Sequence, residues 1–233
     1  MINKATYYLT PNAASTAFTG TGYTPDGTIP AGAIPCTQEQ AQNFQAYVPS
    51  NGEIVAAPSS VLLQQAQSAQ IALVTQGYNT ATDYVPVTIN GTTYQVNNTA
   101  GKQALNLSLT ITANAMMQSP AWVASTEYSA GAYCSVGGVI LFCSMAGKSG
   151  TSAPTPPTTF GTPVTDGTAA WELLGRKVYL QGGSFVYMTP QQILSAFQQG
   201  ELYLHQMSNQ LESLIAQINA AQTSGAVAAI VWP

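Results

Sequence analysis

Apolar positions follow their most regular pattern near the C-terminus. From position 193 to position 221 they recur at alternating spacings of four and three, which is the heptad pattern of a coiled-coil helix. Thr189-Pro190-Gln191-Gln192 supplies a helix start, with Thr as N-cap, Pro at the first helical position and Gln at the third. The pattern predicts a helix over 190–222. Its apolar seam is Ile193, Phe197, Leu204, Met207, Leu211, Leu214 and Ile218.

Helical spacing also appears upstream. Apolar residues favour helices over 61–77 and 101–117, although the second segment also alternates like a strand; helix is the interpretation we favour there. A shorter helix near 38–47 follows Thr37-Gln38-Glu39-Gln40, a capping-box pattern.

Period-two patterns separated by turn residues predict hairpins. Asn90-Gly91 between two alternating runs is the strongest short-range hairpin signal, and paired glycines stand at the other two predicted turns. The three predicted hairpins are 85–89 with 92–96, 132–136 with 139–143, and two strands within 177–188.

These patterns divide the chain into regions of different texture. Residues 1–58 are rich in Gly, Pro and Thr, with short predicted strands that suit an attachment region. Residues 59–119 and 176–233 combine helices with hairpins and are interpreted as one parent domain. Residues 120–175 lack helical periodicity and are interpreted as a small inserted β-rich module. The predicted fold class is therefore α+β, ending in a heptad helix.

Composition narrows the function classes. Only 6% of the 233 residues are charged, against roughly 25% in an ordinary soluble domain, while Ser, Thr, Asn and Gln make up 78 residues. Such a surface suits a subunit of a large assembly. A net charge of −4 with five basic residues does not build a nucleic-acid site. The longest apolar run, Ala226 to Trp232, is too short for a membrane span, and the start has no apolar core of signal-peptide length.

Residues that carry chemistry are sparse. The single histidine, His205, falls on a solvated heptad position beside Glu201, and the nine acids are scattered. We therefore expect no catalytic, metal or cofactor site. A glycosidase carboxylate pair drawn from Glu127, Asp166 and Glu172 is the alternative that stays open.

The three cysteines argue against a disulfide framework. In the predicted hairpin Cys134 faces Leu141, so Cys143 is only a diagonal neighbour, beyond comfortable disulfide reach. We expect reduced thiols and folding in a cytosol.

Short motifs stand near both ends of the chain. Near the start these are Tyr7-Tyr8, Ile29-Pro30, and Ile34-Pro35-Cys36-Thr37 before a short helix. They are similar to the opening of phage tail-fibre-associated and tail-fibre assembly proteins. A capped helix from Thr189-Pro190, the run Ile218-Asn-Ala-Ala221 and a final Trp232 are similar to the end of a family of phage tail proteins. No catalytic residue is associated with these motifs.

A second resemblance covers residues 120–175. The segment contains, in order, Ala121-Trp122, Tyr128-Ser-Ala-Gly131, Val136-Gly137-Gly138, Phe142, Gly150-Thr-Ser-Ala-Pro154, Asp166-Gly167-Thr168 and Trp171. This order is similar to chitin-type carbohydrate-binding modules. Flat aromatic faces match the apolar faces of pyranoses, so candidate glycan contacts are Trp122, Tyr128, Tyr133 and Trp171. For Trp122 and Trp171 a role in the module's own core is the interpretation we favour, whereas both roles stay open for Tyr128 and Tyr133.

Together the patterns and resemblances favour a non-enzymatic virion tail component of a tail fibre or baseplate. It would fold in the host cytoplasm and contribute to host-surface attachment or fibre assembly. Expected partners are other tail proteins, a host surface glycan and further copies of the chain, with a trimer implied by the resemblance to fibres. One alternative is an assembly chaperone that leaves the virion; another is the binding module of a secreted polysaccharide-degrading enzyme. The heptad seam alternatively packs on the chain's own helix at 61–77.

Overall fold

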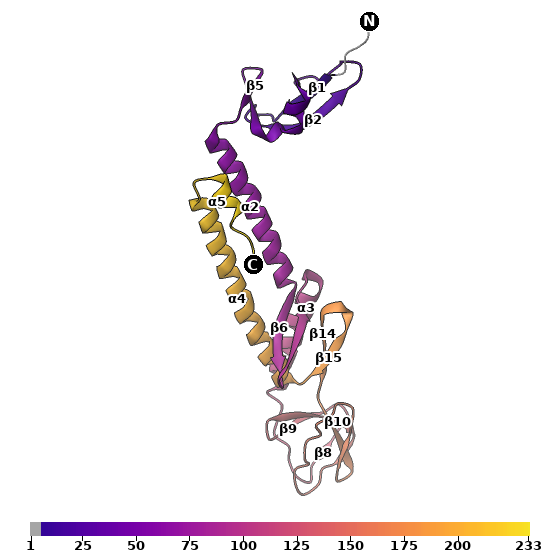
Figure 1. The fold of residues 1–233 in the computed structure, drawn as a ribbon. Coiled ribbons are helices and arrows are strands. Elements are labelled where there is room, and N and C mark those ends of the chain that lie inside the picture. Colours follow the sequence, from indigo (N-terminus) through magenta and orange to yellow (C-terminus); the bar gives the residue numbers. More distant parts are fainter. Residues whose placement is uncertain (1–5) are drawn as a thin grey trace. The chain divides into compact units, whose positions relative to one another are not determined.

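A computed structural model describes residues 6–233; the first five residues, on which part of the expectation about a signal peptide rests, lie outside the described range. The fold is mixed α+β, with 37% helix, 31% strand and several small antiparallel sheets, so neither element type dominates (Figure 1). Contacts divide the chain into two compact units. One comprises Met1–Thr75 with Ser213–Pro233, and the other comprises Gln76–Glu212.

The first unit begins with two small antiparallel β structures. A three-stranded sheet has the order β2-β1-β3, and its strands are β1 (Thr6–Pro11), β2 (Phe18–Thr24) and β3 (Ile34–Cys36). Buried Leu9 and Phe18 anchor it. A second hairpin consists of β4 (Tyr47–Ser50) and β5 (Glu53–Ala56).

The capping box predicted at Thr37 is confirmed. The Thr37 hydroxyl accepts from the Gln40 amide at 3.1 Å, and the Gln40 side chain accepts from the Thr37 amide at 2.9 Å. The helix that follows is shorter than predicted: α1 spans Gln38–Gln42, and the 3-10 turn η1 spans Phe44–Ala46.

Helices make up the rest of the first unit, where glutamine amides provide the polar connections. Here the first part of α2 (Ser59–Thr82) meets the last turn of α4 (Pro190–Ala220), and α5 (Ser224–Ala228) follows. Gln67 Nε2 donates to three carbonyls at the C-terminal end of α4, those of Ile218, Asn219 and Ala221, at 3.0–3.3 Å. These bonds satisfy carbonyls that a helix end leaves unpaired.

Two predicted boundaries differ in these helices. The helix predicted over 61–77 begins at Ser59 and continues to Thr82, so that Gly77 lies inside α2. A helical glycine costs only about 1 kcal/mol, which neighbouring helical residues offset. The apolar tail after 225 contains α5, capped by Thr223, whose hydroxyl accepts from the Ala226 amide at 3.1 Å.

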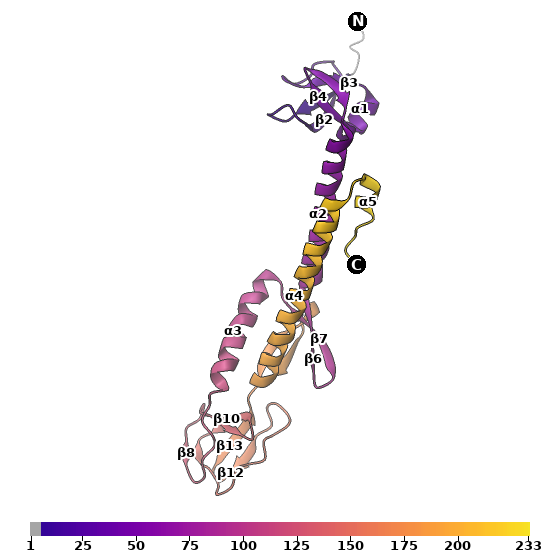
Figure 2. The ribbon, with the colours of Figure 1, turned by 90° about the vertical axis from the view of Figure 1, so that its left-hand side faces the viewer.

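The second unit centres on two hairpins packed against helices. One is β6 (Tyr84–Ile89) with β7 (Thr92–Asn97), and the other is β14 (Arg176–Tyr179) with β15 (Phe185–Met188), linked by the 3-10 turn η2 (Gln181–Gly183). Figures 1 and 2 show these hairpins together with α4 and α3 (Ala100–Met116), and side chains from all of these elements form one core. The buried core residues are Val85, Val87, Ile89, Ala113, Val178, Met188 and Ile193.

Local signals account for these elements. Asn90 and Gly91 both adopt positive φ, 50° and 78°, as a two-residue hairpin turn requires. The N-terminus of α4 carries the predicted cap, since the Thr189 amide donates to Gln192 Oε1 at 2.9 Å and the Gln192 amide donates to the Thr189 hydroxyl at 3.3 Å. The helical interpretation of 101–117 is confirmed by α3.

Residues 120–175 form a β-rich part of the second unit. A four-stranded antiparallel sheet has the order β12-β13-β10-β9, and a two-stranded one pairs β11 with β8. The strands are β8 (Glu127–Tyr128), β9 (Tyr133–Val136), β10 (Val139–Met145), β11 (Gly147–Lys148), β12 (Val164–Asp166) and β13 (Ala169–Leu173). The predicted register is confirmed, with Leu141 opposite Cys134.

Candidate functional site

A single carboxylate ties together the two tryptophans that were glycan candidates. Asp166 Oδ2 accepts from Trp122 Nε1 at 2.8 Å and from Trp171 Nε1 at 3.0 Å, while Asp166 Oδ1 accepts from the Gly150 amide at 2.7 Å. Trp171 is fully buried, so its ring offers no face to a sugar. It is a core side chain and not a glycan contact. Trp122 packs half-buried against the same core.

Tyr128 also serves this core. Its ring meets Trp171 edge-on with centroids 4.8 Å apart, and its hydroxyl accepts from the Val123 amide at 2.8 Å. Both its ring and its hydroxyl are therefore already engaged within the β-rich region.

Cys134 and Cys143 are buried in the same cluster. Burial, with the Asp166 carboxylate and Cys143 as smaller causes, raises the pKa of Cys134 to about 12, and burial also raises the pKa of Cys143. A neutral thiol in such a place behaves as a small apolar side chain.

Tyr133 differs from the other candidates because it lines a groove. The groove has a volume of about 420 Å³ and lies where β9, β10 and β13 meet the β14–β15 hairpin. Its lining residues are Tyr133, Phe142, Phe160, Gly161, Glu172, Leu173, Gly175, Arg176 and Tyr187. We call it the aromatic groove.

The rings of the aromatic groove form two pairs. Tyr133 and Phe142 have centroids 5.9 Å apart, and Phe160 and Tyr187 have centroids 5.7 Å apart. Gly175 makes room for the second pair, because a Cβ there would lie 2.5 Å from the Phe160 ring. The sequence analysis did not identify Phe160, Arg176 or Tyr187 as site residues. It predicted only the hairpin with its turn at Gly182-Gly183, which places Arg176 and Tyr187 on paired strands.

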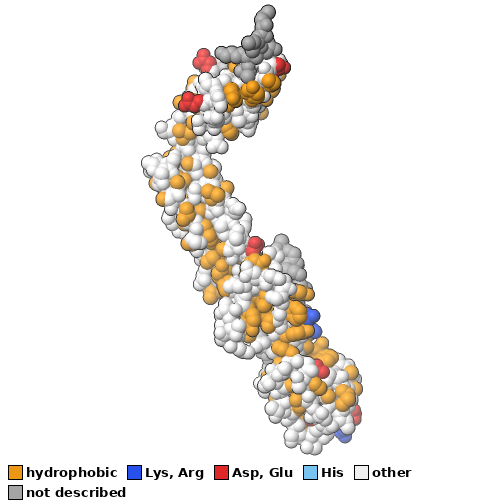
Figure 3. Space-filling model, turned by 45° about the vertical axis from the view of Figure 1, so that its right-hand side comes forward, with side chains coloured by type: hydrophobic (Ala, Val, Ile, Leu, Met, Phe, Trp, Pro, Cys, Tyr) orange, Lys and Arg blue, Asp and Glu red, His pale blue; other side chains and the backbone are white. Residues whose placement is uncertain are grey.

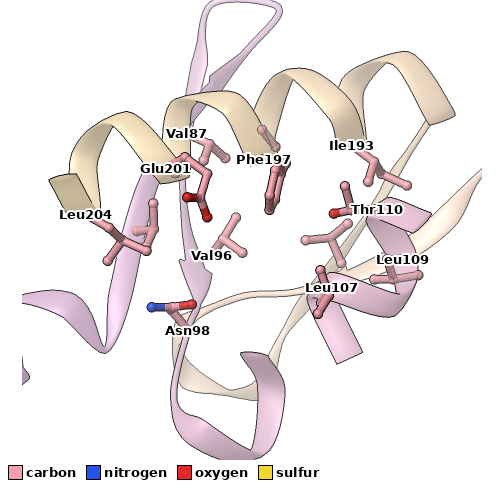
Figure 4. Close-up of a pocket in the computed structure, with 14 residues that line it drawn as sticks. Val87, Val96, Asn98, Leu107, Leu109, Thr110, Ile193, Phe197, Glu201 and Leu204 are labelled. Atoms are coloured by element: carbon pink, nitrogen blue, oxygen red, sulfur yellow. The ribbon is translucent and has the colours of Figure 1, made fainter. Parts of the chain in front are cut away.

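The second hollow is more apolar and involves the predicted seam. It has a volume of about 500 Å³ and is walled by β6, β7, α3 and the first half of α4 (Figure 4). Phe197 and Leu204 reach it from α4, Leu107 reaches it from α3, and Glu201 and Asn98 supply polar atoms. We call it the apolar groove.

The seam residues have unequal surroundings. Ile193 and Ile218 are buried inside the chain, whereas Leu204, Met207, Leu211 and Leu214 are half-buried. Phe197 is 39% exposed. The chain therefore uses both ends of the seam for its own core, and the surface that a partner can reach is concentrated at Phe197 and the apolar groove.

Charged side chains are few on the face seen in Figure 3. Within residues 6–233, no three His, Cys, Asp or Glu side chains gather as a metal site would require. His205 is exposed and lies 3.2 Å from Asn209, measured from Nε2 to Nδ2. None of the helices in the described part of the chain is long and apolar enough to cross a membrane.

Comparison of the chain with protein-family models, with curated proteins and with solved structures finds no match.

Proposed function

We propose that this chain is a non-enzymatic structural component of a phage tail, in the fibre or the baseplate, that contributes to host-surface attachment or to fibre assembly. The apolar groove carries the proposal. A soluble monomer usually buries large apolar surfaces within its own fold, whereas a subunit of an assembly exposes them where a neighbouring subunit binds. Leu107 and Phe197, which line this groove, are 53% and 39% exposed.

A second copy of the chain is the occupant we propose. Apolar surface continues beyond the groove, since Ile111, four residues after the groove residue Leu107 on α3, is 64% exposed. A second copy that covers the groove would bury this side chain too. Only Glu201 and Glu212 carry charge on α4, so ion pairs do not select a foreign partner. Threefold association is the form that the resemblance to tail-fibre proteins implies.

The arrangement of acids supports the non-enzymatic part of the proposal. Glycoside hydrolysis needs two carboxyl groups facing one another across a cleft. Of the three acids considered, Glu127 is exposed on β8, Asp166 is buried with both oxygens bonded, and Glu172 alone lines the aromatic groove. Polysaccharide cleavage that Glu172→Gln abolishes would contradict this part.

The proposal is tested in a phage from which the coding sequence has been deleted. Supplied in trans, the wild-type chain and a Leu202→Asp control should restore adsorption to host cells, whereas Phe197→Asp should not. Leu202 stands on the same helix, is 59% exposed and does not line the apolar groove. Normal adsorption without any copy of the chain contradicts the proposal.

A further inference from the structure

Two turns of the chain carry the same dipeptide. Asn51-Gly52 joins β4 to β5 and Asn90-Gly91 joins β6 to β7, and all four residues are exposed, with φ between 50° and 83°. Neither asparagine side chain has a hydrogen bond to the described part of the chain. A Cβ on either glycine would meet nothing within 4 Å, so the space beside each turn is open.

An exposed Asn-Gly pair reacts with itself, because the glycine nitrogen stands beside the asparagine side-chain amide and glycine has no Cβ to hinder the approach. We propose that Asn51 is a site of spontaneous deamidation, and that the surroundings of the Asn90 turn protect it from the same reaction. The two turns differ in what holds them closed.

The reaction needs only water. The Gly52 nitrogen attacks Cγ of Asn51, and a succinimide ring closes as the Cγ–Nδ2 bond breaks. The amide leaves as ammonia, with the proton that the Gly52 nitrogen loses. Water then opens the ring at one of its two carbonyl carbons: opening at Cγ gives aspartate, and opening at the backbone carbonyl carbon gives isoaspartate, whose main chain runs through Cγ.

The hairpin that contains Asn51 has little to keep it closed. β4 and β5 form four residue pairs, and none of their residues is buried. A two-residue hairpin turn holds the asparagine in one backbone conformation, so ring closure requires the turn to open. Segments with few buried apolar side chains open at low free energy, and Asn51 therefore often reaches a reactive conformation.

The hairpin that contains Asn90 is fastened to the core of the second unit. Its six residue pairs include buried Val87 and Ile89 near the turn. Gln199 of α4 also binds the strand beside the turn, since its Oε1 accepts from the Thr88 amide at 2.7 Å and its Nε2 donates to the Thr88 carbonyl at 3.2 Å. Opening this turn breaks these contacts, so the same dipeptide reacts more slowly here.

Conversion at Asn51 changes both the shape and the charge of its hairpin. Isoaspartate adds one carbon to the main chain, which a two-residue turn does not accommodate, so the pairing of Ser50 with Glu53 is lost. Either product adds a carboxylate close to Glu53, in a stretch, residues 6–75, that contains no lysine or arginine. This hairpin therefore alters as the protein ages, whether or not the chain belongs to a phage tail.

Peptide mass spectrometry of the full chain, incubated in mildly alkaline buffer, tests the proposal. We expect Asn51 to convert about tenfold faster than Asn90 in the native chain. In guanidinium chloride both turns are open, so the two rates should become similar. Gln199→Ala should speed the conversion of Asn90 and leave that of Asn51 unchanged, whereas Gln206→Ala, at an exposed position of the same helix, should change neither.

Four results overturn the inference. Asn51 does not convert; Asn90 converts as fast as Asn51 in the native chain; Asn51 keeps its full advantage in guanidinium chloride; or Asn90 stays as slow in the Gln199→Ala chain as in the wild type. Circular dichroism of each variant establishes that it is folded. Because the comparison is made between two turns of one isolated chain, its outcome is independent of the proposed function.

Discussion

At the scale of single residues, Asp166 is the polar centre of the β-rich region. It accepts hydrogen bonds from two indole N–H groups and one backbone amide, at 2.7–3.0 Å. A carboxylate accepts at every lone pair, whereas an asparagine presents an NH₂ group to at least one of these donors.

We therefore predict that Asp166→Asn lowers the free energy of unfolding by about 3 kcal/mol, because a buried donor loses its acceptor. Urea denaturation followed by tryptophan fluorescence measures the change. Glu127→Gln, which alters an exposed carboxylate in the same region, should stay within about 0.5 kcal/mol of the wild type. Equal effects of the two substitutions would show that the three hydrogen bonds contribute nothing specific.

A second prediction at this scale concerns the thiols. With the pKa of Cys134 raised to about 12, its thiolate fraction at pH 8 is about one in ten thousand, so alkylation in the folded state is very slow. Cys36 is half-buried and should be labelled first, although burial raises its pKa too. Mass spectrometry after alkylation reads out the order.

The same experiment in denaturant, without reductant, should count three free thiols. A count of one would show that Cys134 and Cys143 are bridged. The diagonal register of these two residues on β9 and β10 is the reason we expect three.

At the scale of elements, the helix caps and hairpin turns that have a local sequence signal are present in the structure. The caps at Thr37 and Thr189 and the turn at Asn90-Gly91 each satisfy backbone groups within a few residues, so the sequence alone predicts them. The same Asn-Gly pair turns β4 into β5 at Asn51-Gly52, with φ of 52° and 83°, and the predicted elements omit this hairpin although its signal is present.

The aromatic groove shows why much of the site is hidden from sequence. Its rings come from four places between 133 and 187, and no local rule brings Phe160, in a loop, beside Tyr187. The pairing depends on Gly175, which leaves space for the Phe160 ring, and this is visible only in three dimensions. Conversely, Trp171 is one of the four aromatic residues that the sequence motif offered as glycan contacts, and it is fully buried.

The exposed part of α4 gives a prediction for self-association. If the apolar groove receives a second copy, Phe197→Asp places a charge at the contact and should reduce the mass measured by sedimentation to that of one chain. Leu202→Asp introduces the same charge on the same helix away from the groove, so it should leave the mass unchanged. A wild-type chain that already sediments as a monomer at micromolar concentration contradicts self-association through this groove.

At the scale of the whole molecule, the β-rich region and its surroundings have separable cores. The core around Val85 and Met188 contains no residue between 120 and 175. Side-chain packing links them at two places: a smaller cluster in which Met116 packs against Ile140 and Leu174, and the Phe160–Tyr187 ring pair.

We predict that deleting 120–175 and joining Ser119 to Arg176 leaves the remaining chain folded. The deletion exposes the Met116 side chain, which should lower the free energy of unfolding by about 2 kcal/mol. Calorimetry of the deletion variant should show a cooperative transition. Its absence would place the boundary of the module elsewhere.

The most direct test of the central proposal is quantitative mass spectrometry of purified phage particles. A structural tail component should be retained through gradient purification, at a fixed copy number in proportion to a known tail protein, and a threefold assembly predicts a multiple of three. A chain abundant in the infected-cell lysate but missing from the particles would contradict the account and identify an assembly factor instead.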